Sequence, residues 1–422
     1  MVFIPLDSEM KMVKLKVLRM LSLYSVGALF SNLVGLFTIP ILFTTLGSAA
    51  WGEIVIAQSI GTILALIIDL GYSNFAPAKI STLTEHEKVL FYSISLRNRF
   101  KVFLFFFIVI LVLELLSVFK FSSTAILVII AYAVQGLSSS WLFVAQNDAK
   151  SYLLKIMAPR TMGILSGAIL CFAFPSGLSF AILLLIGSLL SLTFNYKITR
   201  NSYLENVWEE PEVILDSKPS PKILANFLNS MMSNIQQQIP LLIISAINPI
   251  IFIQFALADK IIKSTSGVLW PVIALFQGSV LSSKTKRNRR SSSIETRFTA
   301  SIGFICIVLI PNICNPFLRL ITKNSYEFSF LEATLIGVIV FSIYVNSIQS
   351  SVHTVRKNLE HKLLFSNLCS LIIVSTGLFL SRTYNLLAVT LLIILFSYLV
   401  NAVLMRYALK VRLRTHESAF PN

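Results

Sequence analysis

The stretch KVFLFFFIVILVLELLSVF, residues 101–119, decides the fold class of this chain. Apolar residues fill it without the strict alternation that a membrane β-strand requires. A helix crosses the hydrocarbon core of a bilayer with about 20 mainly apolar residues. Runs of this kind recur along the 422 residues of the sequence. We therefore predict an all-α polytopic membrane protein with almost no soluble part.

The composition agrees with a membrane protein and excludes several other classes. Apolar residues make up 55% of the chain and charged residues only 13%, whereas an average soluble domain is about 25% charged. The four cysteines lie inside apolar runs without metal-ligand spacing, so we expect no metal and no cofactor. The sequence contains no P-loop, GxSxG or HExxH motif. We therefore expect no enzyme and no catalytic residue.

Hydropathy predicts about twelve transmembrane helices in two six-helix lobes around a central cavity. Residues 1–200 are expected to form the N-terminal lobe, 201–221 a cytoplasmic linker and 222–422 the C-terminal lobe. The linker region is the longest polar stretch and lies near the midpoint of the chain. The predicted spans are 21–43, 52–74, 102–119, 123–145, 159–175, 178–196, 223–247, 250–281, 298–318, 330–352, 363–380 and 384–409.

Lysine and arginine follow the distribution that the positive-inside rule predicts. Of the 35 basic residues, 29 fall at the termini and in the even-numbered loops, and four fall in the opposite loops. The remaining two, Lys260 and Lys263, lie inside a span. This bias places both termini in the cytoplasm. It also explains the net charge of +16 without a nucleic-acid partner.

Charges inside the bilayer are functional candidates, because burying them costs several kcal/mol. The best cluster is Asp259, Lys260 and Lys263 in the eighth span, about halfway through the membrane. We predict that the lysines hold an anionic headgroup and that Asp259 serves as a coupling or gating acid. The alternative is a buried structural ion pair. Asp69, near the inner end of the second span, is a second candidate acid or an interfacial cap.

Amide and hydroxyl side chains recur at helical spacing in four spans. They either line a polar cavity or hydrogen-bond one helix to another. For the stripe in the seventh span we favour the cavity. The candidate lining residues are Asn32, Gln58, Asn229, Ser233, Gln237 and Asn346.

Two stretches carry a resemblance to a known family. The first is LGSAAWGEIVIAQSIGTILALIIDLGYSNFAPAKI, residues Leu46–Ile80, with its LG, WG and DLG elements. The second is FALADKIIKSTSGVLWP, residues Phe255–Pro271. Together with the twelve spans, they resemble the bacterial O-antigen and polysaccharide-repeat flippases of the multidrug/oligosaccharidyl-lipid/polysaccharide exporter superfamily.

The resemblance implies a V-shaped pair of six-helix bundles around a cationic cavity. Such proteins move an undecaprenyl-pyrophosphate-linked oligosaccharide across the bacterial cytoplasmic (inner) membrane. By position, Lys260 and Lys263 match basic residues of the family pattern, and Asp259 and Asp69 match its acids. Few arginines lie inside the first lobe, so Arg99, near the start of the third span, is the expected third pyrophosphate ligand.

Two other functions remain open from the sequence, namely a membrane-embedded polysaccharide polymerase and a cation-coupled drug exporter of the same superfamily. The expected partners are the lipid-linked oligosaccharide and anionic lipids, which the basic run at residues 284–290 suits. A polysaccharide polymerase and a chain-length regulator are further expected partners. No nucleic acid is expected.

Overall fold

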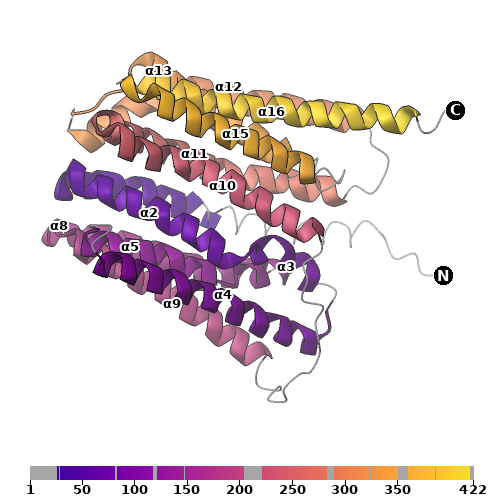
Figure 1. Ribbon diagram of the computed structural model, residues 1–422, viewed down its shortest axis with the longest axis horizontal. Helices are drawn as coiled ribbons and strands as arrows, with labels where there is room; N and C mark the ends of the chain where they lie inside the picture. Colours follow the sequence, from indigo (N-terminus) through magenta and orange to yellow (C-terminus); the bar gives the residue numbers. More distant parts are fainter. Residues whose placement is uncertain are drawn as a thin grey trace, which may run out of the picture.

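The structure is a computed structural model, which describes residues 26–27, 29–80, 83–116, 121–146, 148–203, 221–282, 289–323, 325–349, 360–384 and 386–418. These residues form helices and short connections, with no strand among them. Long helices lie roughly parallel to one another along the long axis of the molecule (Figure 1). The predicted all-α architecture is confirmed.

The first lobe contains the helices from the N-terminal half of the chain. Within it α2 packs on α5, and α8 packs on α9. Two of its membrane-crossing helices change type along their length: α5, η1 and α6 follow one another over Ser123–Phe143, and α7, η2 and α8 over Ala149–Ala173. The helices are Leu29–Leu46, α2 (Ser48–Asp69), α3 (Tyr72–Ile80), α4 (Glu85–Leu115), α5 (Ser123–Ala133), η1 (Val134–Leu137), α6 (Ser140–Ala145), α7 (Ala149–Ser151), η2 (Tyr152–Met157), α8 (Ala158–Ala173) and α9 (Gly177–Tyr203).

The second lobe contains the helices from the C-terminal half, drawn from pink to yellow in Figure 1. In this lobe α10 packs on α15, α12 on α13, and α16 on both α13 and α15. Its helices are α10 (Pro221–Ile247), α11 (Pro249–Ser282), α12 (Arg289–Thr322), α13 (Phe330–Ile348), α15 (Glu360–Leu380) and α16 (Leu387–Ser418). Most of the predicted linker, residues 204–220, lies outside the described residues, and so do residues 284–288 of the basic run.

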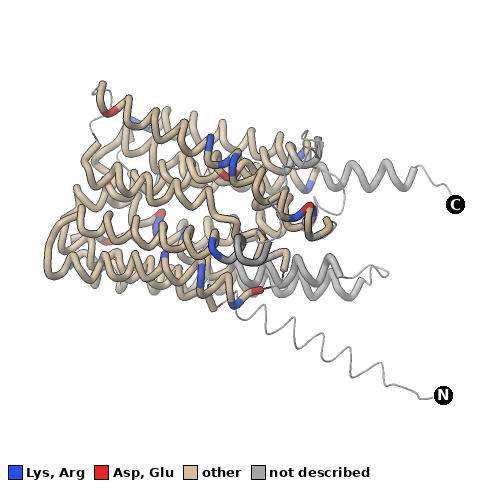
Figure 2. Tube along the Cα trace, turned by 90° about the horizontal axis from the view of Figure 1, so that it is seen from below, with Lys and Arg blue, Asp and Glu red and all other residues tan. Residues whose placement is uncertain are grey.

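Nine helices in the described part of the chain are long and apolar enough to cross a membrane. Three further long helices, α4, α10 and α11, run beside them (Figure 1), so that the described residues form six long helices in each lobe. Charged residues are sparse along the described helices, as Figure 2 shows. Large apolar side chains face outward, for example Phe105 at 61% and Phe172 at 69% exposure. Hydrocarbon accommodates such a surface, and the chain is a multi-pass membrane protein.

Short connections such as Gly47 and Asn248 lie at the end of the bundle that the charge bias predicts to face away from the cytoplasm. We call this the outer end and the opposite one the inner end. At the outer end the two lobes touch. The Phe43 ring lies 5.9 Å from that of Tyr326, and Gly52 lies directly against Phe252. Aromatic side chains therefore contact the opposite lobe at the outer end.

Candidate functional site

A cavity of about 270 Å³ lies between the two lobes. Helix 29–46, α2, α5, α8 and α9 form its wall on one side, and α10 and α11 form it on the other. Its lining includes three cationic side chains, Arg160, Lys260 and Lys263, and no carboxylate among the described residues. We call this cavity the anion chamber, because its charged groups are all positive.

Lys260 connects the lobes across the anion chamber. It lies eleven residues after the start of α11, which places it about 16 Å along the helix. Its ammonium group donates a hydrogen bond to the side-chain oxygen of Gln58 on α2. An ammonium group that is partly removed from solvent needs an acceptor, and here the amide of the opposite lobe supplies it.

Lys263 lies one turn further along α11 and has two partners. Its ammonium nitrogen lies 2.7 Å from a carboxylate oxygen of Asp259, and it donates a 2.8 Å hydrogen bond to the side-chain oxygen of Gln238 on α10. Residues at i and i+4 share a helix face, so this ion pair follows from the sequence spacing. The Lys263 side chain keeps 25% of its surface exposed, against 8% for Asp259.

Arg160 is a chamber cation that the sequence analysis missed. The prediction placed Arg160 at the very edge of the fifth span, 159–175, and counted it among the loop charges, but the helix begins at Ala149 and places Arg160 well inside it. Its guanidinium lies 5.4 Å from the Tyr132 ring centre. Its buried Nε has no hydrogen-bond partner among the described residues. The apolar run YLLKIMAP at residues 152–159 was the signal that the span starts earlier.

Arg99, the predicted third pyrophosphate ligand, does not line the anion chamber. It is fully buried, and its Nη1 donates to the carbonyls of Gly136 and Ser138, where the α5–η1–α6 helix is interrupted. Its other donors bind the Ser95 carbonyl and the Ser95 and Ser139 hydroxyls. All five N–H groups of the guanidinium are thereby used. Arg99 satisfies backbone carbonyls that the helix break leaves open and has no donor left for an anion.

Asp69 also lies outside the anion chamber. It ends α2, and its carboxylate accepts hydrogen bonds from the Ser73 backbone N–H at 3.0 Å and the Ser73 hydroxyl at 2.9 Å. Between them the chain turns through Leu70 and Gly71, both with positive φ. This arrangement matches the interfacial-cap alternative, since the carboxylate holds the start of α3 after the turn.

The predicted polar stripes divide between cavity lining and helix contacts. Gln58 lines the anion chamber, Gln237 lines a second cavity, and Asn32 lines both. Ser233 lines neither. Asn229 is buried and accepts a hydrogen bond at its carbonyl from Asn367, and Asn346 donates to the Tyr398 carbonyl at 3.0 Å.

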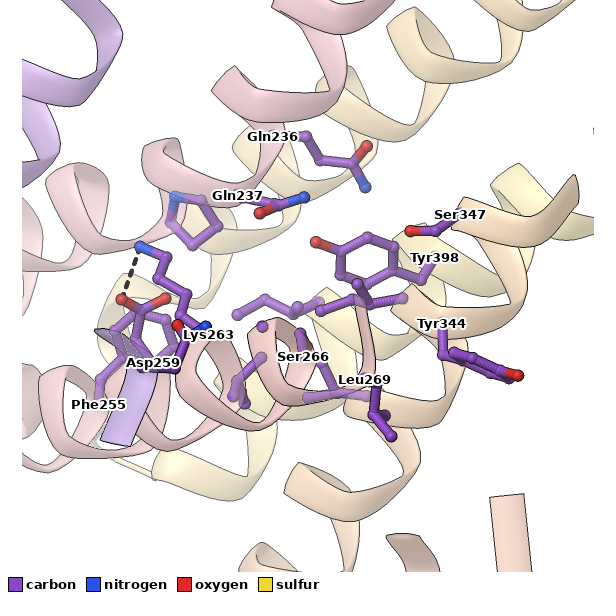
Figure 3. A pocket seen from close by; sticks show the side chains of 17 residues that line it. Gln236, Gln237, Phe255, Asp259, Lys263, Ser266, Leu269, Tyr344, Ser347 and Tyr398 are labelled. Atoms are coloured by element: carbon purple, nitrogen blue, oxygen red, sulfur yellow. Dashed lines mark ion pairs between the residues drawn. The ribbon is translucent and has the colours of Figure 1, made fainter. Parts of the chain in front are cut away.

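The second cavity, of about 300 Å³, lies mainly within the C-terminal lobe. Figure 3 shows the Asp259–Lys263 ion pair at one side and Tyr398 across from it. We call it the lobe cavity. Asn32 and Lys263 line both cavities, so the lobe cavity and the anion chamber adjoin. Its described lining residues are Asn32, Gln236, Gln237, Pro240, Phe255, Asp259, Ile262, Lys263, Ser266, Gly267, Leu269, Ile339, Ile343, Tyr344, Ser347, Ile394 and Tyr398.

Solved structures with a similar fold are transporters. One is a MATE transporter in complex with MaD5, with 13% identity and a TM-score of 0.58, over 94% of this chain and 96% of that one. Another is an inward-facing multidrug resistance MATE family transporter of the MOP superfamily, with 13% identity and a TM-score of 0.57, over 95% and 96%. A mutant of the Vibrio cholerae MATE transporter VcmN matches with 13% identity and a TM-score of 0.56, over 94% and 97%.

The chain has the MATE transporter fold. The solved structures that share the fold include a MOP superfamily transporter, and the shared fold says nothing about the substrate. No family profile matches the sequence, and no curated protein matches it. The substrate must therefore be argued from the cavities of this chain.

Proposed function

We propose that this chain is a flippase for an undecaprenyl-pyrophosphate-linked oligosaccharide, such as an O-antigen or other surface polysaccharide repeat unit. It would move this lipid across the bacterial cytoplasmic membrane by alternating access of the two lobes. The observation that carries the proposal is the anion chamber. It combines Arg160, Lys260 and Lys263 with no lining carboxylate, between the lobes of a transporter fold.

The chemistry of the anion chamber suits a pyrophosphate. Charge-assisted hydrogen bonds from ammonium and guanidinium groups to phosphate are about twice as strong as neutral ones. The side-chain oxygens of Gln58 and Gln238 accept hydrogen bonds from the two lysines, and phosphate oxygens are better acceptors for the same groups. The aromatic contact between Phe43 and Tyr326 joins the lobes at the outer end, which supports loading from the inner leaflet.

A drug exporter is the second candidate, and one observation favours it. The lobe cavity is largely aliphatic and contains the carboxylate of Asp259, which are features that suit an apolar cation. Against this reading, Asp259 is already paired with Lys263 at 2.7 Å. A cation in the lobe cavity would also lie beside the positive anion chamber.

A polysaccharide polymerase is less well supported. Such an enzyme needs catalytic groups on a loop at the outer face. Here α8 ends at Ala173 and α9 begins at Gly177, while α10 and α11 are separated by Asn248 alone. The proposal keeps the polymerase and a chain-length regulator as partners of the same pathway, and anionic lipids as partners of the basic run.

Export of repeat units in cells that lack the chromosomal gene tests the proposal. Cells with the double variant Lys260→Ala plus Lys263→Ala should export at least about 10-fold less, because two charged contacts are lost. Lys150→Ala removes an exposed lysine outside both cavities and is the matched control. Lys260→Arg keeps the charge and should retain most of the export.

A structural effect of the double variant must be separated from loss of substrate binding. Removing Lys263 alone leaves Asp259 without its ion-pair partner. The variant Lys263→Met plus Asp259→Asn removes both charges and should still lower export. Normal surface polysaccharide at normal protein abundance in both double variants would overturn the proposal.

A further inference from the structure

The lobe cavity is connected to the anion chamber by shared wall residues. Asn32 and the Lys263 side chain line both. A ligand that places its anion on Lys263 therefore has its next chemical group at the mouth of the lobe cavity. In the proposed substrate, that group is the sugar bonded directly to the pyrophosphate.

Polar groups without protein partners face the lobe cavity. Tyr398 is only 7% exposed, and Figure 3 shows its hydroxyl pointing into the cavity toward the Gln237 side chain. Among the described residues, neither the Tyr398 hydroxyl nor the Gln237 amide has a hydrogen-bond partner. The buried Ser266 hydroxyl also has none. The Gln237 amide is half-buried, and it and the Tyr398 hydroxyl line the cavity, so both are available to a ligand with its own donors and acceptors.

Aliphatic side chains form another part of the wall. Ile339 and Ile343 on α13, Ile394 on α16 and Leu269 on α11 form much of it. A cavity of about 300 Å³ lies at the small end of the range of roughly 300–1,000 Å³ for small-molecule sites. It suits one ring with a few polar substituents. A hydroxyl group placed against the isoleucines would be left unsatisfied, whereas a methyl group fits there.

We propose that the lobe cavity is a subsite for the first sugar of the lipid-linked oligosaccharide and selects a ring that carries an acetamido group. This inference rests on the proposed flippase function. An acetamido group has one donor and one acceptor, and it pairs reciprocally with the Gln237 amide. Its methyl group contacts the isoleucines, and the Tyr398 hydroxyl binds a ring oxygen or hydroxyl. The subsite therefore contributes specificity, while the anion chamber contributes charge.

Calorimetric titration of the purified full chain in detergent tests this subsite. Three probes share one short isoprenyl pyrophosphate: the free pyrophosphate, its N-acetylglucosamine derivative and its glucose derivative. We expect the acetamido sugar to bind about 10-fold more tightly than glucose, the effect of one or two good hydrogen bonds. Gln237→Leu should reduce this ratio to within about 2-fold and leave binding of the sugar-free pyrophosphate unchanged.

Two further variants make the test decisive. Gln254→Leu is the same substitution on α11 at a residue that lines neither cavity, and it should keep the full preference. Ile343→Trp fills the cavity. It should lower the affinity for both sugar derivatives until it approaches the affinity for the sugar-free pyrophosphate. A sugar preference that is absent from the natural protein, or unchanged in Gln237→Leu and Ile343→Trp, overturns the subsite alone. Failure of all three probes to bind the natural protein overturns the flippase function together with the subsite.

Discussion

The Lys260 ammonium on α11 is hydrogen-bonded to the side-chain oxygen of Gln58 on α2, so a cation of one lobe is held by an amide of the other. The amide competes with any anion for that ammonium. Binding of a phosphate to Lys260 therefore weakens a direct hydrogen bond between the lobes. Movement of the lobes is what alternating access requires.

Substitutions of Gln58 should change anion binding in opposite directions. Gln58→Ala removes the competing acceptor and should tighten pyrophosphate binding about 2- to 10-fold, the net effect of one hydrogen bond. Gln58→Glu provides a carboxylate for Lys260 and should weaken binding by about 10-fold or more. Titration calorimetry with inorganic pyrophosphate measures both. Equal affinities in the two variants would show that Gln58 and the anion do not share Lys260.

Arg160 should act as an anion ligand. Arg160→Gln removes a charged donor from the anion chamber and should weaken pyrophosphate binding about 10- to 100-fold. Arg160→Lys keeps the charge but loses the planar set of guanidinium donors. Its affinity for pyrophosphate should therefore lie between those of the natural protein and Arg160→Gln. The same titration measures the effect, with Lys150→Ala as the control. Natural affinity in Arg160→Gln would exclude Arg160 from the site.

Arg99 should support the fold and have no direct role in binding. Arg99→Gln leaves the carbonyls of Gly136 and Ser138 without their donor and should lower the free energy of unfolding by about 3 kcal/mol or more. Arg99→Lys should also destabilise, because one ammonium cannot make five hydrogen bonds. Thermal unfolding in detergent measures this. If Arg99→Gln kept the natural stability but bound pyrophosphate more weakly, Arg99 would be an anion ligand and not a support of the fold.

The start of α4 should respond to pH through Glu87. The Thr84 backbone N–H and hydroxyl donate to its carboxylate at 2.7 and 2.8 Å, and these bonds lower the pKa of Glu87 below its ordinary value of 4.5. A lowered pKa in the folded state stabilises the protein above the ordinary value, and this effect disappears as pH falls through the folded-state pKa.

The variant Glu87→Gln isolates that contribution. It should be slightly less stable than the natural protein at pH 7, and the difference should close as the medium becomes more acidic than the ordinary pKa of 4.5. Thermal unfolding between roughly pH 3 and pH 8 follows the difference, a range on both sides of the glutamate pKa. A difference that grows on acidification would contradict the capping role of Glu87.

The sequence predicted the helical architecture well, because each span needs its own apolar run. The seventh span was placed at 223–247 and α10 covers Pro221–Ile247; the eighth was placed at 250–281 and α11 covers Pro249–Ser282. The fifth was placed ten residues late, since Lys155 and Arg160 resemble loop charges under the positive-inside rule. A basic residue in a polar cavity between the lobes breaks that rule, and for this reason Arg160 was missed.

The site was predicted in part. The Asp259–Lys263 pair follows from helical spacing, and Gln58, Gln237 and Asn32 line the cavities. The sequence could not indicate the partner of Arg99, because the broken helix that accepts its hydrogen bonds lies about 40 residues away along the chain. Which member of a polar stripe faces a cavity also depends on how each helix is rotated against its neighbours. Depth along the helix matters as well: Ser233 and Gln237 share one face of α10, but only Gln237, one turn further along, lies at the level of the lobe cavity.

Transport by the purified protein in liposomes tests the central claim most directly. The measurement follows the appearance of a fluorescent undecaprenyl-pyrophosphate-linked oligosaccharide in the opposite leaflet. The natural chain should speed its crossing, and the triple variant Arg160→Gln, Lys260→Ala and Lys263→Ala should reduce the rate to that of empty liposomes. Crossing at the natural rate in a folded triple variant, or acceleration of an apolar cation in place of the pyrophosphate lipid, would contradict the account.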